Sequence, residues 1–310
     1  MEKQTGCVHI YCGDGKGKTT CGMGLCTRAA GYGYRVLIYQ FMKDNSTSER
    51  KVLLLSPNVT FVPGQDKIKF SFLMTPEEKA EQKRYYEEQF QKVTEKAVQE
   101  EYDVLFLDEL PEFRKNVLDG MRQPMEERKV QIARSAGMVT YPSDFILVAA
   151  MNPCPCGYYP DRNKCRCTQP QIEKYLGKIS GPILDRIDLC VELHPVDILH
   201  LQKTKTEKSS EDMKRQIRHA RERQAERFAG TDCRFNGDIR SAQVEEYCPL
   251  GEEGQKVMEQ LYRTLQLSAR VYHRILKTAR TIADLEDREE ITGEHLLEAA
   301  CYRPSETYWN

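Results

Sequence analysis

The residues best suited to phosphate chemistry lie near the start of the chain. A glycine-rich run, 13–20, follows a short apolar segment and precedes a segment with helical spacing. Glycines let backbone N–H groups turn toward phosphate oxygens, and the start of the next helix adds positive potential. Lys18 would reach the terminal phosphates, and the Thr19 hydroxyl would bind Mg²⁺. Cys12 stands where the usual spacing has its first glycine, so the pattern is missed by one position.

A glycine-rich turn with no ligand is the alternative, but the Gly-Lys-Thr in this place favours ATP. The residues expected to bind ATP are Gly13, Gly15, Lys16, Gly17, Lys18, Thr19 and Thr20.

A second candidate is the acidic pair Asp108-Glu109, which ends the apolar segment 104–107. In ATP hydrolysis the first carboxylate of such a pair holds Mg²⁺ through water, and the second polarises the attacking water. Asp108 and Glu109 are therefore assigned these two roles. An acidic turn at a strand end is the alternative.

Four of the twelve cysteines cluster as Cys-x-Cys pairs separated by eight residues. Four thiolates on a short polar loop can close a tetrahedral zinc site, although Cys-x-Cys is tighter than the common Cys-x-x-Cys. Reduced thiols or an oxidisable hairpin are the alternatives. The candidate ligands are Cys154, Cys156, Cys165 and Cys167.

The elements that must position these residues alternate between strands and helices. Apolar runs predict strands at 8–12, 35–41, 59–62, 104–107, 145–150 and 188–193. A helix is expected at 19–30, and another opens at Thr75, where Glu78 completes a capping box. Such alternation predicts an α/β fold: a parallel P-loop NTPase sheet in three αβα layers.

The last third of the chain is expected to be helical, at 211–228, 252–265, 269–285 and 294–301. We therefore expect an α/β core over 1–200, a polar linker over 201–210 and an all-helical lid over 211–310. Within the core, the patterns of 1–107 and of 108–200 are typical of two different kinds of nucleotide-binding protein.

Composition narrows the class of protein. The 310 residues include 46 basic and 47 acidic ones, a net charge of −1, so no global basic field attracts nucleic acid. No apolar run reaches the roughly 18 residues of a membrane span, and the N-terminus lacks a signal-peptide pattern. A cytoplasmic protein without membrane contact is expected.

Residues of about 5–109 resemble the P-loop cob(I)alamin (corrinoid) adenosyltransferases. The resemblance rests on 13–20, on Arg28-Ala29-Ala30-Gly31 and on Gln40-Phe41-Met42-Lys43. It implies that the loop holds the triphosphate of ATP and that a corrinoid is the second substrate. The Thr-Gly-Arg segment that follows the acidic strand in that family is not found here.

Residues of about 104–303 resemble the magnesium-chelatase-like AAA+ ATPases, in their competence-associated branch. The carrying strings are Asp108-Glu109-Leu110-Pro111, Ala149–Gly157, Ser180–Asp188 and Ala279–Leu285. In both families another strand lies between the phosphate-loop strand and the acidic strand. The resemblance thus predicts a hybrid sheet, with 145–150 between 8–12 and 104–107.

The second resemblance also implies roles for three further residues. Asn152, after strand 145–150, would sense the γ-phosphate. Arg186 would stabilise charge in a neighbouring subunit of a ring. Arg270, at the start of a helix, would close the lid on nucleotide, with Arg280 as the fallback. Without the resemblance, Asn152 is equally a turn former and Arg186 a structural partner of Asp185 or Asp188.

A basic helix in the last third raises the question of DNA. Its basic residues are Lys214, Arg215, Arg218, Arg221, Arg223 and Arg227, interleaved with four acidic ones. A solvated, salt-bridged face is favoured over a DNA site, and weak DNA binding stays open.

Three functions follow. The first is a magnesium-chelatase-like AAA+ ATPase that remodels a substrate with ATP and Mg²⁺. The second is a corrinoid adenosyltransferase. The third is a recombined or misassembled reading frame that only binds ATP.

Overall fold

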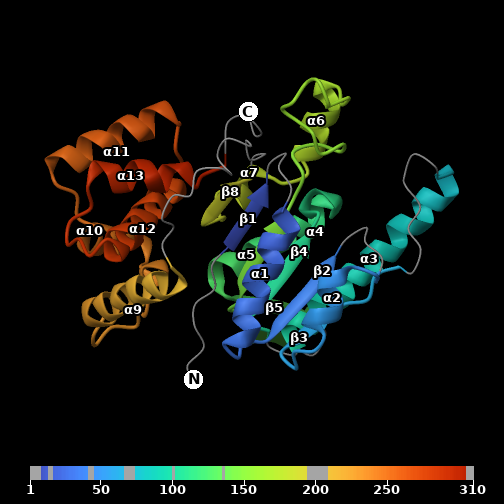
Figure 1. Ribbon diagram of the computed structural model, residues 1–310, viewed down its shortest axis with the longest axis horizontal. Helices are drawn as coiled ribbons and strands as arrows, with labels where there is room; N and C mark the ends of the chain where they lie inside the picture. Colours follow the sequence, from blue (N-terminus) through green and yellow to red (C-terminus); the bar gives the residue numbers. More distant parts are fainter. Residues whose placement is uncertain are drawn as a thin grey trace. The chain divides into compact units, whose positions relative to one another are not determined.

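The computed structural model describes residues 8–12, 17–40, 45–65, 74–99, 102–134, 137–193 and 209–304 (Figure 1). The chain forms two compact units. The first holds residues 1–183 and 191–194, and the second holds 184–190 and 195–308.

A six-stranded sheet is the centre of the first unit, with the strand order β3-β2-β4-β7-β1-β8. The strands are β1 (Val8–Cys12), β2 (Val36–Gln40), β3 (Val59–Phe61), β4 (Val104–Asp108), β7 (Ile146–Ala150) and β8 (Leu189–Glu192). From β3 to β1, each strand runs parallel to its neighbour. An α/β fold with a parallel sheet is thus confirmed.

The position of β7 confirms the predicted hybrid sheet. Leu147 pairs with Val8 of β1 on one side and with Leu105 of β4 on the other. A strand of the chelatase-like segment therefore lies between β1, which belongs to the other resemblance, and β4, where the two resemblances overlap.

Helix α1 (Lys18–Gly31) covers one face of this sheet (Figure 1). Its Met23 and Cys26 are buried in one cluster with Phe106 of β4 and Val148 of β7. A Cβ atom on Gly22 would lie 2.5 Å from the Phe106 ring, so glycine permits the close approach of helix and sheet. The strands of both resemblances thus share one buried core.

Alternate side chains of the strands point to the face of the sheet opposite α1. Tyr39 of β2 is 1% exposed and packs edge-on against Phe113, with ring centroids 6.0 Å apart. Burial, and then the nearby Tyr86 and Tyr85 of α3 (Pro76–Gln99), raise the Tyr39 pKa above its ordinary value. The face of the sheet opposite α1 thus packs against Phe113.

The predicted capping box of α3 is confirmed. The backbone N–H of Glu78 donates to the Thr75 hydroxyl over 3.2 Å, and the Thr75 N–H donates to the Glu78 carboxylate over 2.9 Å. Such reciprocal bonds satisfy two amides that a helix start leaves without partners.

Several short elements complete the first unit. They are α2 (Ser48–Leu53), the 3-10 turn η2 (Leu110–Glu112), α4 (Lys115–Gly120), α5 (Arg122–Glu127), the antiparallel hairpin β5–β6 (Lys129–Arg134 and Gly137–Pro142), α6 (Gln169–Leu176) and α7 (Gly181–Leu184). The sequence patterns predicted none of these short elements.

The second unit is helical, as predicted. It contains α9 (Ser210–Arg227), α10 (Val244–Tyr247), α11 (Glu252–Thr264), α12 (Ala269–Leu285) and α13 (Gly293–Cys301), with 3-10 turns at Asn236–Asp238 and Ser241–Gln243. Most of the linker expected at 201–210 lies outside the described residues.

A buried carboxylate joins the helices of this unit. Asp284 is 1% exposed and accepts hydrogen bonds from Arg227 at 2.5 Å and Asn236 at 2.8 Å. Arg280 Nε donates to it over 3.2 Å. Because a buried charge is costly unless paired, this network ties α9 and the 3-10 turn to α12.

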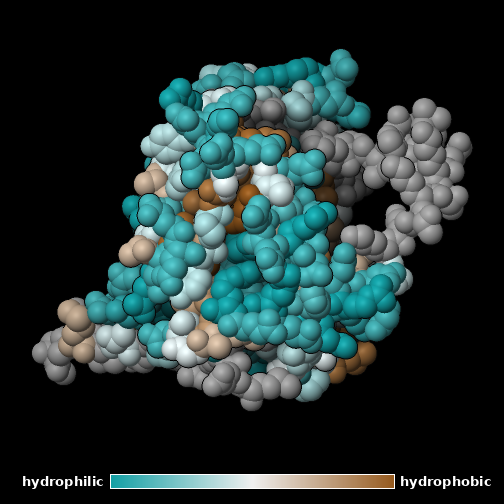
Figure 2. Space-filling view, turned by 90° about the vertical axis from the view of Figure 1, so that its left-hand side faces the viewer, coloured by the Kyte–Doolittle hydropathy of each residue, from teal (hydrophilic) through white to brown (hydrophobic). Residues whose placement is uncertain are grey.

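Hydrophilic side chains cover most of the face shown in Figure 2. Among the described helices, none combines the length and the apolar character needed to cross a bilayer.

Candidate functional site

The start of α1 forms one wall of the candidate site. Gly17, just before the helix, has φ +105°, a left-handed conformation that glycine adopts without strain. The first backbone N–H groups of a helix have no partner within it, and they carry partial positive charge. Lys18, Thr19 and Thr20 form this first turn. Three expected ATP ligands, Gly13, Gly15 and Lys16, lie outside the described residues.

Thr19 and Asp108 meet at the carboxyl edge of the sheet. The Thr19 hydroxyl donates to the two Asp108 oxygens over 3.2 and 3.4 Å. Asp108 is 1% exposed, and the Gln40 amide donates to it over 3.4 Å. A hydroxyl beside a buried carboxylate is a hard oxygen donor set of the kind that Mg²⁺ prefers.

Gln40 is a site residue that sequence reasoning missed. It ends β2 directly opposite Asp108, which ends β4. The Thr47 hydroxyl donates to the side-chain amide oxygen of Gln40 over 3.3 Å. The sequence signal for Gln40 was a polar side chain at the end of an apolar strand. Because the ends of parallel strands meet at one edge of a sheet, such a side chain is expected to lie near the site.

Glu109 and Asn152 form the second pair of the site. The Asn152 amide donates to both Glu109 carboxylate oxygens, over 3.2 and 2.9 Å. Glu109 has φ +54°, which is uncommon for a residue other than glycine. Such conformations concentrate at functional sites, where the surroundings hold them. The four residues Thr19, Asp108, Glu109 and Asn152 thus come together.

The other two assigned residues, Arg186 and Arg270, belong to the second unit. Arg186 is 8% exposed. Asp188, one of its suggested partners, forms an ion pair with Arg274. Arg270 lies in the first turn of α12, as expected, and its side chain is exposed.

The fallback residue Arg280 is a structural residue. It is 2% exposed, and it donates to Asp284 and to the carbonyl oxygens of Arg288 and Glu289. Its guanidinium is thus engaged within the helical unit.

The basic residues of α9 divide between two environments. Lys214, Arg215, Arg218 and Arg221 are exposed, whereas Arg227 pairs with the buried Asp284. Arg215 also pairs with Asp212 over 2.7 Å. These pairs fit the favoured interpretation of a salt-bridged face.

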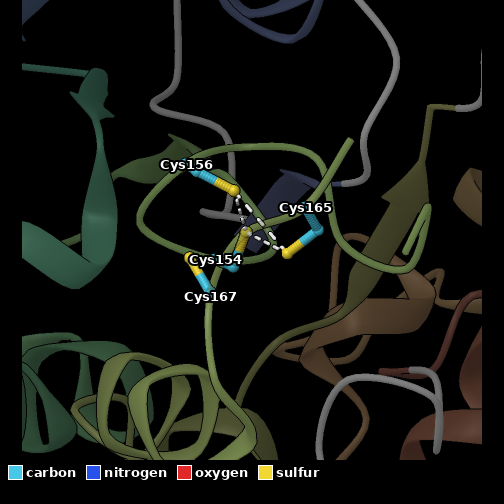
Figure 3. A group of neighbouring side chains, drawn as sticks. All are labelled: Cys154, Cys156, Cys165 and Cys167. Atoms are coloured by element: carbon cyan, nitrogen blue, oxygen red, sulfur yellow. Dashed lines mark hydrogen bonds between the residues drawn. The ribbon is translucent and has the colours of Figure 1, made fainter. Parts of the chain in front are cut away.

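The four clustered cysteines point toward one another (Figure 3). Their sulfur atoms all lie within 4.8 Å of one another. The Cys154 sulfur is 3.4 Å from that of Cys156 and 3.8 Å from that of Cys165, and the last two are 3.6 Å apart. These distances exceed the roughly 2.05 Å of a disulfide, and all four are free thiols.

The backbone around Cys156 stabilises a thiolate. Burial raises the pKa of Cys156, but hydrogen bonds from the backbone of Tyr158 and Arg166, together with those from the Cys154 and Cys167 side chains, outweigh it and lower the pKa to about 6. Hydrogen bonds to a charged form favour that form.

Three matches to families of known proteins cover most of the chain. Residues 4–119 match the family described as ATP:corrinoid adenosyltransferase BtuR/CobO/CobP. Residues 95–201 match magnesium chelatase, subunit ChlI, and residues 207–303 match the C-terminal part of that subunit. The first two matches overlap over 95–119, which includes β4 and the acidic pair. The predicted change of resemblance at this strand is confirmed.

Individual relatives show the same division. The uncharacterized protein YifB of Escherichia coli is 43% identical over 202 residues, 64% of this chain and 39% of YifB. The competence protein ComM of Haemophilus influenzae is 42% identical over 201 residues, 64% of this chain and 38% of ComM. The corrinoid adenosyltransferase of Escherichia coli is 37% identical over 60 residues, 19% of this chain and 31% of that enzyme. The chain thus aligns with less than half the length of each relative.

Proposed function

We propose that the protein binds ATP with Mg²⁺ and hydrolyses it, as a magnesium-chelatase-like AAA+ ATPase. The observation that carries the proposal is the meeting of Thr19, Asp108, Glu109 and Asn152 at one sheet edge. These side chains come from α1, β4 and the end of β7, so the site needs both segments of the chain.

Each residue of the site has a separate role in hydrolysis. Thr19 and Asp108 would hold Mg²⁺, which neutralises charge on the phosphate oxygens. Lys18 and the first N–H groups of α1 bind the phosphates. Glu109 accepts a proton from water as the water oxygen attacks the γ-phosphorus. The bond to the bridging oxygen of ADP breaks, and phosphate leaves. Asn152 orients Glu109 and contacts the γ-phosphate.

The second unit would act as a lid over the nucleotide, closed by Arg270. Arg186 would act on the nucleotide of a neighbouring subunit in a ring, so hydrolysis would require assembly. The energy of hydrolysis would drive the remodelling of a substrate. Weak DNA binding through the exposed basic residues of α9 would require an affinity that falls steeply with salt.

Phosphorus NMR of the products from Mg·ATP, with and without reduced corrinoid, tests the proposal. We expect ADP and orthophosphate without corrinoid, and their loss in Glu109→Gln. Intact ATP in both samples would overturn the proposal and leave a protein that at most binds ATP.

The second candidate is the corrinoid adenosyltransferase, which the match over 4–119 favours. Its signature in the same experiment is triphosphate that forms only with reduced corrinoid. This outcome would assign the chemistry to the first segment and leave the chelatase-like segment without a role in it.

A further inference from the structure

The loop that joins β7 to α6 carries the cysteine cluster and has little apolar core of its own. Residues 151–168 are all described, and they contain neither helix nor strand. Its buried side chains are Met151, Pro153, Cys154 and Cys165. A loop of this length with so few buried side chains needs another source of order, such as a metal ion or a cross-link.

The sulfur positions fit a single tetrahedral metal ion. A zinc–sulfur bond is about 2.3 Å, which places the corners of an ideal tetrahedron about 3.8 Å apart. The three sulfur–sulfur distances of 3.4, 3.6 and 3.8 Å lie at or just below this value. The fourth sulfur, of Cys167, lies within 4.8 Å of the others. The donor set is therefore that of a closed Cys₄ site.

We propose that these four thiolates bind one zinc ion and that the closed loop holds Asn152 in position against Glu109. The cysteines are thus positioning residues for the acidic pair. The metal site stands on the sulfur geometry alone, whereas its effect on hydrolysis rests on the proposed ATPase function.

The link from the cluster to Asn152 is short. Asn152 precedes Cys154 by two residues, with the buried Pro153 between them. The N–H of Gly157 donates to the Cys154 carbonyl over 3.0 Å, which closes a turn around Cys156. Gly157 has φ +82°, and a Cβ atom there would lie 3.7 Å from the Asn152 amide oxygen. The turn that carries two ligands therefore also packs against the Asn152 amide.

The metal site is tested on the purified full-length protein by elemental analysis and by zinc release on thiol modification. We expect about one zinc ion per chain. Cys165→Ser removes a ligand and should lose most of the zinc. Cys301→Ser removes an exposed thiol outside the cluster and should retain it. Equal zinc in both variants, or protein without zinc from zinc-containing medium, would overturn the site.

The coupling is tested by hydrogen exchange on the intact protein with zinc and after its removal. We expect faster exchange at 108–110 and 150–157 without zinc, and unchanged exchange in α12 of the other unit. Unchanged exchange at 108–110 would refute the coupling, whether or not the protein hydrolyses ATP.

Steady-state kinetics tests whether zinc affects hydrolysis through the position of Asn152. Because a misplacement of about 1 Å costs roughly 100-fold in rate, zinc removal should lower kcat by about 10- to 100-fold and leave KM for ATP nearly unchanged. In an Asn152→Ala background it should have little further effect, since both changes act on one contact. If the effects of zinc removal and of Asn152→Ala on kcat were fully additive, Asn152 would not be the link between the metal site and Glu109. Zinc-loaded protein that hydrolyses no ATP would refute the ATPase and leave the metal site standing.

Discussion

Asn152 donates two hydrogen bonds to Glu109, although 43 residues separate them in the chain. The contact exists because β4 and β7 are neighbouring parallel strands, and each residue lies just beyond the end of its strand. A carboxylate held at both oxygens has a defined orientation, which a general base requires.

Glu109→Gln should abolish hydrolysis and leave ATP binding intact. The amide keeps the shape of the side chain but cannot accept a proton from water, so we expect a loss of at least about 100-fold in kcat. Phosphate release and binding of a fluorescent ATP analogue measure the two properties. Glu112→Gln is the matched control: Glu112 pairs with Lys178 at 3.5 Å, and its loss should change kcat by less than about 3-fold.

Thr19→Ala should weaken the binding of Mg·ATP more than that of metal-free ATP. The substitution removes a hydroxyl that lies 3.2 Å from the Asp108 carboxylate and would bind the metal. Titrations with Mg²⁺ and with EDTA separate the two affinities. Thr27→Ala is a suitable control, because the Thr27 hydroxyl donates to the Met23 carbonyl within the same helix over 2.8 Å. Equal effects of the two substitutions would contradict the assigned metal site.

Gly22→Ala should destabilise the first unit. The added Cβ atom would lie 2.5 Å from the Phe106 ring, which is fully buried. Overpacking of this kind costs about 1–3 kcal/mol, which exceeds the gain in helix propensity of about 1 kcal/mol. Gly24→Ala, in the same helix, meets nothing within 4 Å and should stabilise it. Denaturation followed by circular dichroism compares the two.

Asp284→Asn should destabilise the helical unit by about 3–5 kcal/mol at pH 7, because Arg227 and Arg280 lose their buried partner. Asp287→Asn, at an exposed position, should cost less than about 1 kcal/mol. Thermal unfolding of both variants provides the comparison.

The same carboxylate predicts a pH dependence. Burial raises the pKa of Asp284, but the hydrogen bonds from Arg227 and Asn236 lower it below its ordinary value. Its contribution to stability is therefore complete above the unfolded pKa of about 3.9 and is lost as the pH falls through the folded pKa. Below about pH 4, the native protein should lose stability faster than Asp284→Asn. Parallel curves for the two proteins would contradict this assignment.

Patterns within single segments predicted the strands and long helices well, because apolar runs and capping signals are local. The prediction for 8–12 coincides with β1, and that for 269–285 coincides with α12. The hairpin β5–β6 escaped notice because its connection, Ser135-Ala136, lacks the Asn-Gly type of turn signal.

The sequence indicated Thr19, Asp108, Glu109 and Asn152 as candidate site residues, but it did not indicate the contacts between them. The sequence placed Asn152 near the γ-phosphate and not against Glu109, because that contact depends on where each side chain points beyond the end of its strand. The role of Gln40 depends in the same way on its register with Asp108. The cysteine spacing indicated a possible metal site, but the common meeting point of the sulfurs comes from the folded loop.

The central place of β7 has a consequence for synthesis on the ribosome. Until residue 150 has been made, β1 and β4 have no strand to join them, and the core around Phe106 is open. The early half of the chain must therefore wait as an incomplete sheet with exposed apolar edges, a state prone to aggregation. Sheet formation has a high contact order, so we expect slow folding and a dependence on chaperones while translation proceeds.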